Sequence, residues 1–297
     1  MRTITTVSDL RQALGRARDQ GQTIGLVPTM GAFHAGHLSL MRRAREECDH
    51  VVVSLFVNPP QFDDAGDLEH YPRDEARDRA LAAEAGVDTL FAPSVEEVYP
   101  SGFSTSVVVR DQTETLEGTC RGPEHFEGVA TIVSKLFNIV APDVAYFGQK
   151  DAQQAFVIKR LVNDLHFPVR VEVCPTIREP DGLASSSRNV RLPRAERPRA
   201  TALRRALDAA TTAVAEGVTD AQEIKARAAS ELHEAEIEPD YLEIVCAETF
   251  EPLSEIDREA LALVAARVGD TRLIDNQLLS PALVATAPAR VSATGRH

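Results

Sequence analysis

Short apolar runs alternate with longer amphipathic segments over residues 23–175, and this alternation restricts the possible folds more than any other feature of the chain. A run such as "HVVVSLFV" (50–57) is too short and too rich in β-branched residues for a helix, so it predicts a buried strand. Strands that alternate with helices form a mostly parallel sheet with helices on both faces. The expected strands are 23–28, 50–57, 87–92, 144–148 and 169–175, and the expected helices are 37–48, 73–85 (ending at Gly86), 128–140 and 151–164.

The pattern changes after "PTIREPDGLASSSRNVRLP" (175–193), where we expect a domain boundary. Two alanine-rich helical segments, 195–215 and 219–234, precede three strand-like segments at 240–245, 260–268 and 271–276. This order is typical of a small α+β domain with antiparallel strands. We therefore predict an α/β domain over 1–178, a smaller α+β domain over 179–279 and a loose tail over 280–297.

Polar segments directly follow three of the predicted parallel strands. They are His34 to His37, Asn58 to Gln61, and Gly148 to Asp151. Ligands of open α/β sheets bind outside the carboxyl ends of the strands, so these segments are expected to meet at one site.

The first of these segments, "HAGH", has two histidines three residues apart at the start of a predicted helix. Imidazole rings can donate N–H groups and can become positively charged near a phosphate, and a helix N-terminus adds its own N–H groups and dipole. The spacing places both rings on one face, and Gly36 leaves room for a close approach to the backbone. The pattern favours binding of nucleotide phosphates, on which negative charge develops as pyrophosphate leaves. A chance match at an ordinary turn and a zinc site remain as alternatives, although no third ligand has a supporting spacing.

Other segments supply complementary groups. Lys150 is a compact cation of the kind that binds phosphate, and "SSSR" (185–188) combines hydroxyls with a guanidinium. The amides of Gln61 and Gln154 can both donate and accept, which suits a substrate that carries a hydroxyl and a carboxylate. Arg121 and His125 are expected only to decorate a loop.

The formal net charge of −13 argues against a nucleic-acid partner, and the lack of a basic stripe argues against an anionic membrane surface. No apolar run is long enough to span a bilayer, and the N-terminus lacks the apolar stretch of a secretory signal, so we expect a cytoplasmic protein. The cysteines are far apart and form no CxxC pair, so we interpret them as small core residues: Cys48, Cys120, Cys174 and Cys246.

A series of motifs resembles the pantothenate synthetase (pantoate–β-alanine ligase) family, within the HIGH-type nucleotidyl transferases. The resemblance covers roughly residues 2–276, and the motifs occur in matching order: "VPTMGAFHAGHLSL", "SLFVNPPQF", "YPRD", "HFEGVATIVSKLFNIVAPDVAYFGQKD", "PTIREPDGLASSSRN" and "TRLIDN". It implies a Rossmann-like first domain, a smaller second domain that acts as a lid, and a homodimer. It also implies that ATP, (R)-pantoate and β-alanine give pantothenate, AMP and pyrophosphate through a pantoyl adenylate, with Mg²⁺.

The resemblance also assigns roles by position. It makes His37 the proton donor, Ile177 a backbone contact to adenine, and Gln61 and Gln154 the ligands of pantoate, with Gln61 also a ligand of β-alanine. Charge stabilisation is expected from His34, His37, Lys150, Ser186, Ser187 and Arg188. Asp78 is a weak candidate for the Mg²⁺ ligand. The implied ATP-binding residues are Met30, Gly31, Ala32, Phe33, His34, Ala35, Gly36, His37, Gly148, Gln149, Lys150, Asp151, Ile177, Ser185, Ser186, Ser187 and Arg188.

Four positions depart from the family's usual pattern: Ala35, Gln149, Ala152 and Ser185. They leave open the alternative that the chain is a nucleotide-binding homologue with impaired catalysis. Another adenylyl transferase, acting on a phosphate-bearing substrate, is disfavoured because Gln61 and Gln154 are neutral. A fragment of an aminoacyl-tRNA synthetase is disfavoured by the acidic charge. The matching charged and hydroxyl groups favour an active ligase.

Overall fold

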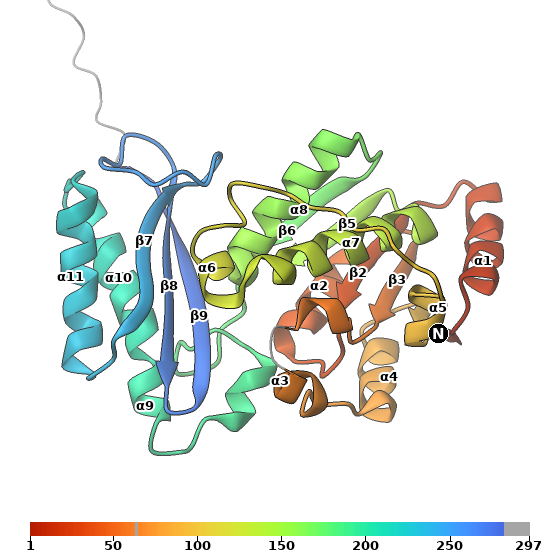
Figure 1. Cartoon of the computed structure of the whole chain (residues 1–297), viewed down its shortest axis with the longest axis horizontal. Coiled ribbons are helices and arrows are strands. Elements are labelled where there is room, and N and C mark those ends of the chain that lie inside the picture. The colour runs from red at the N-terminus through yellow and green to blue at the C-terminus, as the bar shows by residue number, and fades with distance from the viewer. Residues whose placement is uncertain (63–64, 282–297) are drawn as a thin grey trace, which may run out of the picture.

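A computed structural model describes residues 1–62 and 65–281, which form two sheets with surrounding helices (Figure 1). The larger sheet is parallel throughout and has the strand order β1-β4-β3-β2-β5-β6. Its strands are β1 (Arg2–Ile4), β2 (Ile24–Thr29), β3 (His50–Leu55), β4 (Thr89–Phe91), β5 (Val144–Gly148) and β6 (Arg170–Cys174). This arrangement confirms the Rossmann-like α/β fold expected from the alternating pattern.

Helices cover both faces of the larger sheet because alternate side chains of its buried strands point to opposite sides. Leu26 and Val52 pack on the side of α1, α7 and α8, whereas Val27 and Val53 pack on the side of α2 and α4. The helices of this part are α1 (Val7–Asp19), α2 (Ala35–Glu47), α3 (Ala65–Glu69), α4 (Glu75–Glu84), α5 (Val95–Val98), α6 (Glu117–Arg121), α7 (Pro123–Val140) and α8 (Ala152–Leu165), with 3₁₀ turns η1 (Pro59–Gln61) and η2 (Gln149–Asp151).

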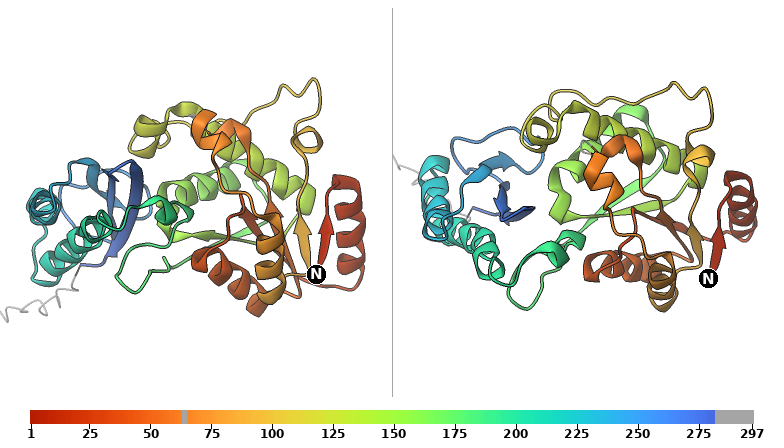
Figure 2. Two further views of the ribbon diagram at one scale, coloured as in Figure 1. Left: turned by 90° about the horizontal axis from the view of Figure 1, so that it is seen from below. Right: turned by 60° about the horizontal axis from the view of Figure 1, so that its bottom comes forward.

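The smaller sheet is antiparallel in the order β7-β8-β9 and completes the α+β part that the sequence predicted. It consists of β7 (Pro239–Cys246), β8 (Ala260–Val268) and β9 (Thr271–Leu279), with helices α9 (Arg197–Ala200), α10 (Ala202–Ala215) and α11 (Ala221–Glu234). The turn η3 (Ser187–Arg191) lies in the connection from the larger sheet. Both views in Figure 2 place α10 and α11 on the outer side of this sheet, away from the larger one.

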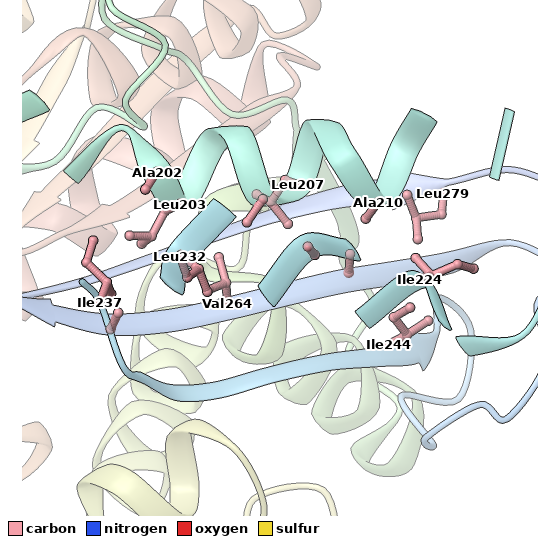
Figure 3. Close-up of a cluster of buried hydrophobic side chains, with 14 of the residues drawn as sticks. Ala202, Leu203, Leu207, Ala210, Ile224, Leu232, Ile237, Ile244, Val264 and Leu279 are labelled. Atoms are coloured by element: carbon pink, nitrogen blue, oxygen red, sulfur yellow. The ribbon is translucent and has the colours of Figure 1, made fainter. Parts of the chain in front are cut away.

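Strand β8 is apolar along its whole length because both of its faces are buried. Val264 points toward Leu207 of α10 and Leu232 of α11 in the core shown in Figure 3. Leu261 and Leu263 point the other way and pack with Ala152 at the start of α8. The smaller sheet therefore has one face on its own helices and the other on the larger part of the molecule.

The differences from the sequence prediction are local. The strand β1 and the helix α1 were not predicted, and α7 begins five residues before the expected start of its helix at residue 128. The helix predicted over 195–215 is two helices, α9 and α10, separated at Thr201. Cys120 is exposed, so the interpretation of all four cysteines as core residues was wrong for this one; Cys48, Cys174 and Cys246 are buried.

The predicted boundary at 178/179 falls in the connection between β6 and η3 and stays a prediction. Most of the predicted tail, from residue 282 onward, lies outside the described residues. Across 1–62 and 65–281, no helix combines the length and apolar content needed to cross a membrane.

Gly128 on α7 allows the turn η1 to lie directly against this helix. A Cβ atom at position 128 would come within 2.6 Å of the carbonyl carbon and oxygen of Pro60 and within 2.7 Å of the Gln61 nitrogen. These are backbone atoms, so the contact cannot be relieved by a change of rotamer. The lack of a side chain at Gly128 therefore lets Gln61 lie directly against α7.

We expect Gly128→Ala to lower the free energy of unfolding by about 1–3 kcal/mol, the usual cost of an overpacked interior. Denaturant titration measures this change. Gly15→Ala is the matched control, because Gly15 lies inside α1 with nothing within 4 Å of the added Cβ. That variant should gain about 0.5–1 kcal/mol from helix propensity. Equal effects of the two substitutions would contradict the proposed close contact.

Candidate active site

A single cleft collects the three strand-end segments singled out from the sequence. It opens at the carboxyl ends of β2, β3 and β5 and is closed on another side by residues of the smaller sheet. The predicted site residues that line it are Met30, His34, Gly36, His37, Gln61, Gly148, Lys150, Asp151, Gln154, Ile177, Ser185, Ser186, Ser187 and Arg188. The remaining predicted residues do not line the cleft: Gly31, Ala32, Phe33, Ala35, Asp78 and Gln149.

The loop between β2 and α2 is held by a buried carboxylate. The Asp78 side chain accepts hydrogen bonds from the Ala32 nitrogen (2.7 Å) and from the Phe33 nitrogen (2.8 Å), and Asp78 is only 1% exposed. Gly31 (φ +88°) and Ala32 (φ +52°) both have left-handed backbone conformations, which these bonds stabilise. Asp78 thus orients the loop from behind, and its burial away from the cleft argues against the suggested role as a Mg²⁺ ligand.

His34 is the N-cap of α2. Its Nδ1 accepts the Gly36 N–H at 3.2 Å and lies 3.1 Å from the Ser185 hydroxyl. A Cβ on Gly36 would lie 2.9 Å from the His34 Cε1 atom, so the glycine makes room for the neighbouring ring. Because Nδ1 accepts, we assign the proton of the neutral ring to Nε2. The Nε2–H group is then the hydrogen-bond donor that the neutral His34 ring can offer to a ligand.

The two histidine rings are uncharged at neutral pH in this structure. Burial, followed by the nearby positive charge of Lys150, lowers the pKa of His34 to about 4. Burial and the adjacent His34 ring, whose centroid is 4.2 Å away, lower the pKa of His37 to about 3. The two rings lie next to each other, as expected for side chains on one face, and a positive charge on them was expected only when phosphate is near. They offer hydrogen bonds, and the positive charge of the cleft comes from other residues.

Two of the cations that line the cleft, Lys150 and Arg188, lie on segments far apart in the sequence. Lys150 is in η2, with its Nζ 3.5 Å from an Asp151 oxygen and its side chain 18% exposed. Arg188 is in η3 and forms an ion pair of 3.0 Å with Asp67 of α3. Arg191 binds the other oxygen of Asp67, also at 3.0 Å. Asp67 therefore holds η3 in place through two arginines.

The neutral end of the cleft is built around Gln61. Its Oε1 accepts from Asn58 Nδ2 at 3.1 Å, and the Tyr99 hydroxyl donates to Asn58 Oδ1 at 2.6 Å. The backbone oxygen of Gln61 lies 2.7 Å from His125 Nδ1. His125 and Arg121 line the cleft, so the expectation that they only decorate a loop was wrong. Both flank the break between α6 and α7, which the sequence pattern did not reveal.

The wall formed by the smaller sheet was not predicted from the sequence. This wall contains a buried ionic cluster in which Glu117 of α6 binds Arg272 of β9 at 2.7 and 2.9 Å and accepts a hydrogen bond from Tyr241 of β7 at 2.9 Å. Burial opposes ionisation of Glu117, but Arg272 and Arg121 outweigh it and hold the pKa of that carboxyl below its usual range. The only available signal was the segment "TRLIDN", in which Arg272, Asp275 and Asn276 lie within five residues.

Within the described residues, no three His, Cys, Asp or Glu side chains are grouped so that they could hold a metal ion. This part of the chain thus gives no support to the zinc interpretation of the two histidines.

The site's geometry can be compared with known proteins. A family model described as pantoate–β-alanine ligase matches residues 2–278. The chain belongs to this family. The pantothenate synthetase of Pelotomaculum thermopropionicum is 50% identical over 278 residues, which cover 92% of this chain and 97% of the relative. The pantothenate synthetase of Sinorhizobium medicae is 51% identical over 283 residues, which cover 95% of this chain and 97% of the relative.

Solved structures of family members have the same fold. The pantothenate synthetase of Thermus thermophilus superimposes with a TM-score of 0.90 at 49% identity, covering 95% of this chain and all of that one. The pantoate–β-alanine ligase of Francisella tularensis was solved in complex with a β,γ-ATP compound and β-alanine. It superimposes with a TM-score of 0.78 at 33% identity, covering 94% of this chain and 97% of that one. Membership of this ligase family makes the cleft the candidate active site.

The lowered histidine pKa values lead to a pH prediction. The folded chain should leave His34 unprotonated down to about pH 4, whereas the unfolded chain takes up that proton near pH 6.5. The free energy of unfolding should therefore fall as pH drops from about 6.5 toward 4. NMR titration of the imidazole Cε1–H signals measures the midpoints, with assignments from His34→Gln and His37→Gln. Midpoints near 6.5 for both rings would contradict the burial argument.

Proposed function

We propose that the chain catalyses the ATP-dependent condensation of (R)-pantoate with β-alanine, giving pantothenate, AMP and pyrophosphate. The observation that carries the proposal is the meeting of three groups in one cleft of a ligase-family fold. The paired histidines and Lys150 form one group, the Ser186-Ser187-Arg188 segment forms the second, and the amides of Gln61 and Gln154 form the third.

The first step forms pantoyl adenylate. A pantoate carboxylate oxygen attacks the α-phosphorus of ATP, a new O–P bond forms, and the bond to the β-phosphate breaks. The carboxylate is ionised at neutral pH, so the step needs no strong base. Lys150, Arg188 and the hydroxyls of Ser186 and Ser187 stabilise the charge on the departing pyrophosphate, and the histidines donate N–H groups.

The second step transfers the pantoyl group. β-Alanine reacts as the free amine, after its ammonium group has released a proton to solvent. Its nitrogen forms a bond to the acyl carbon, the C–O bond to AMP breaks so that AMP leaves with that oxygen, and the nitrogen releases a second proton to solvent. Gln61 holds pantoate and β-alanine at the neutral end of the cleft, and Gln154 also holds pantoate. Walls from both sheets limit access of water to the adenylate.

ATP must compete for Arg188. In the structure this guanidinium is neutralised by Asp67 at 3.0 Å. A triphosphate offers a stronger, multiply charged partner, so binding of ATP shifts Arg188 from the carboxylate toward phosphate. Asp67 thereby keeps an isolated positive charge from being exposed to the cleft in the free enzyme.

Mg²⁺ accompanies ATP in this proposal. Asp151 lines the cleft beside Lys150, and its side chain is 49% exposed. Mg²⁺ in nucleotide sites is usually held by one or two carboxylates together with the substrate phosphates, so the single carboxylate of Asp151 fits. The ion would neutralise phosphate charge.

The proposed assembly is a homodimer, as the family resemblance implies. One surface that suits this assembly is the segment 104–110, which belongs to no helix or strand. Val107 and Val109 pack on the core of the larger part, whereas Val108 between them is 52% exposed. In the proposed dimer, the backbone of a second copy pairs along this segment. The Val107 N–H is already bonded to Thr131 Oγ1 at 2.9 Å, so pairing would use the neighbouring residues.

Product analysis tests the reaction. With ATP, Mg²⁺, (R)-pantoate and β-alanine, we expect pantothenate, AMP and pyrophosphate in equal amounts, and chelation of Mg²⁺ should stop turnover. His37→Ala should slow adenylate formation by about 100-fold or more, as loss of a transition-state donor does. His233→Ala, on the exposed side of α11, is the control. ADP as product would refute adenylate chemistry, and ATP binding without turnover would identify an impaired homologue.

Asp67→Asn tests the competition for Arg188. Removing the carboxylate should tighten ATP binding by about two- to fivefold, the scale of a partly exposed ion pair. Calorimetry with ATP and Mg²⁺ gives the dissociation constants. Asp181→Asn removes the same charge from an ion pair with Arg197 that does not line the cleft, and it should leave ATP affinity unchanged. Weaker binding by Asp67→Asn would mean that Asp67 instead orients Arg188 for phosphate.

A further inference from the structure

We propose that Asn276, on β9 of the smaller sheet, is a positioning residue that holds Lys150 in place for ATP. The inference rests on the proposed ligase reaction, in which Lys150 binds phosphate. It assigns to the smaller sheet a direct part in building the phosphate site. It is independent of any movement of that sheet.

The side-chain amide of Asn276 is fully engaged with the turn that carries Lys150. Its Nδ2 donates to the backbone oxygens of Gln149 (2.8 Å) and Lys150 (3.0 Å). Its Oδ1 accepts from Gln149 Nε2 at 3.1 Å. Asn276 is 3% exposed, so water cannot readily replace these bonds. The amide of Gln149, at a position where the family commonly has glutamate, thus has a specific partner here.

Fixing these two carbonyls matters because of the chemistry of lysine. Its ammonium group sits at the end of a flexible four-carbon stem, and phosphate gains most from a charge that is already in position. Lys150 is the middle residue of η2, between β5 and α8. Bonds to its own carbonyl and to the preceding one fix the backbone from which the stem extends.

The neighbouring residue on β9 makes a parallel contact with the other phosphate-binding segment. Asp275 forms a two-bond ion pair with Arg178 at 2.6 and 3.1 Å, and Arg178 also donates to the Gly182 oxygen at 3.1 Å. This segment continues into Ser185, whose N–H donates to the Ile177 oxygen at 2.9 Å. Arg178 therefore links β9 to the start of the loop that leads to Ser186, Ser187 and Arg188.

The strand geometry explains why adjacent residues reach two different segments. Successive side chains of a strand point to opposite faces. Asn276 is paired with Leu263, which packs toward α8, whereas Asp275 is paired with Val264, which packs toward α10. One edge strand thus holds η2 from one face and the Arg178 loop from the other.

The experiment is a double-mutant cycle on ATP affinity, measured by calorimetry with ATP and Mg²⁺ and without pantoate. Asn276→Ala should weaken ATP binding about tenfold, the scale of lost buried hydrogen bonds. In a Lys150→Ala background the same substitution should change the affinity by less than about twofold, because the residue acts through Lys150. Equal losses in both backgrounds, or no effect of Lys150→Ala alone, would overturn the proposal.

Further variants separate positioning from folding. Asn276→Asp keeps the shape but sets a carboxylate against two carbonyl oxygens, so it should weaken ATP binding at least as much as alanine. Gln149→Met removes one bond of the contact and should act in the same direction by a smaller factor. Gln277→Ala is the matched control, since its amide contacts Arg204 at 2.9 Å and does not line the cleft.

Two readouts complete the test. Circular dichroism and thermal melting should show folded Asn276 variants. The reaction of β-alanine with supplied pantoyl adenylate should proceed at the wild-type rate, because no triphosphate takes part. A parallel loss in that step would point to general structural damage and overturn the proposal. If the wild-type enzyme makes no AMP from ATP and pantoate, the proposed function fails, whereas the ATP-binding cycle still reports on Asn276.

Discussion

The parallel pairing of β2 with β5 is the constraint on which the rest of the site depends. The chain leaves β2 toward the face covered by α2, and it leaves β5 toward the opposite face, covered by α8. The two connections therefore diverge and leave an opening at the carboxyl ends of the strands. His34, His37 and Lys150 line this opening. The fold thus supplies the space for a nucleotide before any side chain is considered.

Electrostatic balance determines how an acidic chain can hold a polyanion. The histidines are half-buried and neutral, so they contribute directed N–H groups at little cost in repulsion between like charges. The cations that line the cleft are paired in the free protein: Lys150 with Asp151, Arg188 with Asp67, and both Arg121 and Arg272 with Glu117. Such pairing keeps the cleft ordered and leaves cations that a stronger anion can take over.

The smaller sheet is more than a cover for the larger one. Its outer face packs on α10 and α11 (Figures 1 and 2). Three residues of its strand β9 line the cleft: Arg272, Asp275 and Asn276. The ionic cluster of Glu117, Arg272 and Tyr241 joins α6 to this sheet, with both charges largely removed from water. A buried ion pair offsets the cost of removing its charges from water only when its geometry is good. The cluster therefore favours one defined orientation of the smaller sheet against α6.

The sequence by itself determined the order of strands and helices from β2 to β6, the parallel character of the first sheet and the three segments that meet at its edge. These features follow from local patterns: β-branched runs such as 50–57 cannot form stable isolated helices, and the carboxyl ends of parallel strands share one edge. Family resemblance added the reaction, but the protonation states and supporting contacts had no local signal. The neutrality of His34 depends on burial, the partners of Asp78 lie more than forty residues away, and Asn276 reaches Lys150 across 126 positions. Only the tertiary structure decided these points, because burial and long-range hydrogen bonds arise when distant segments pack together.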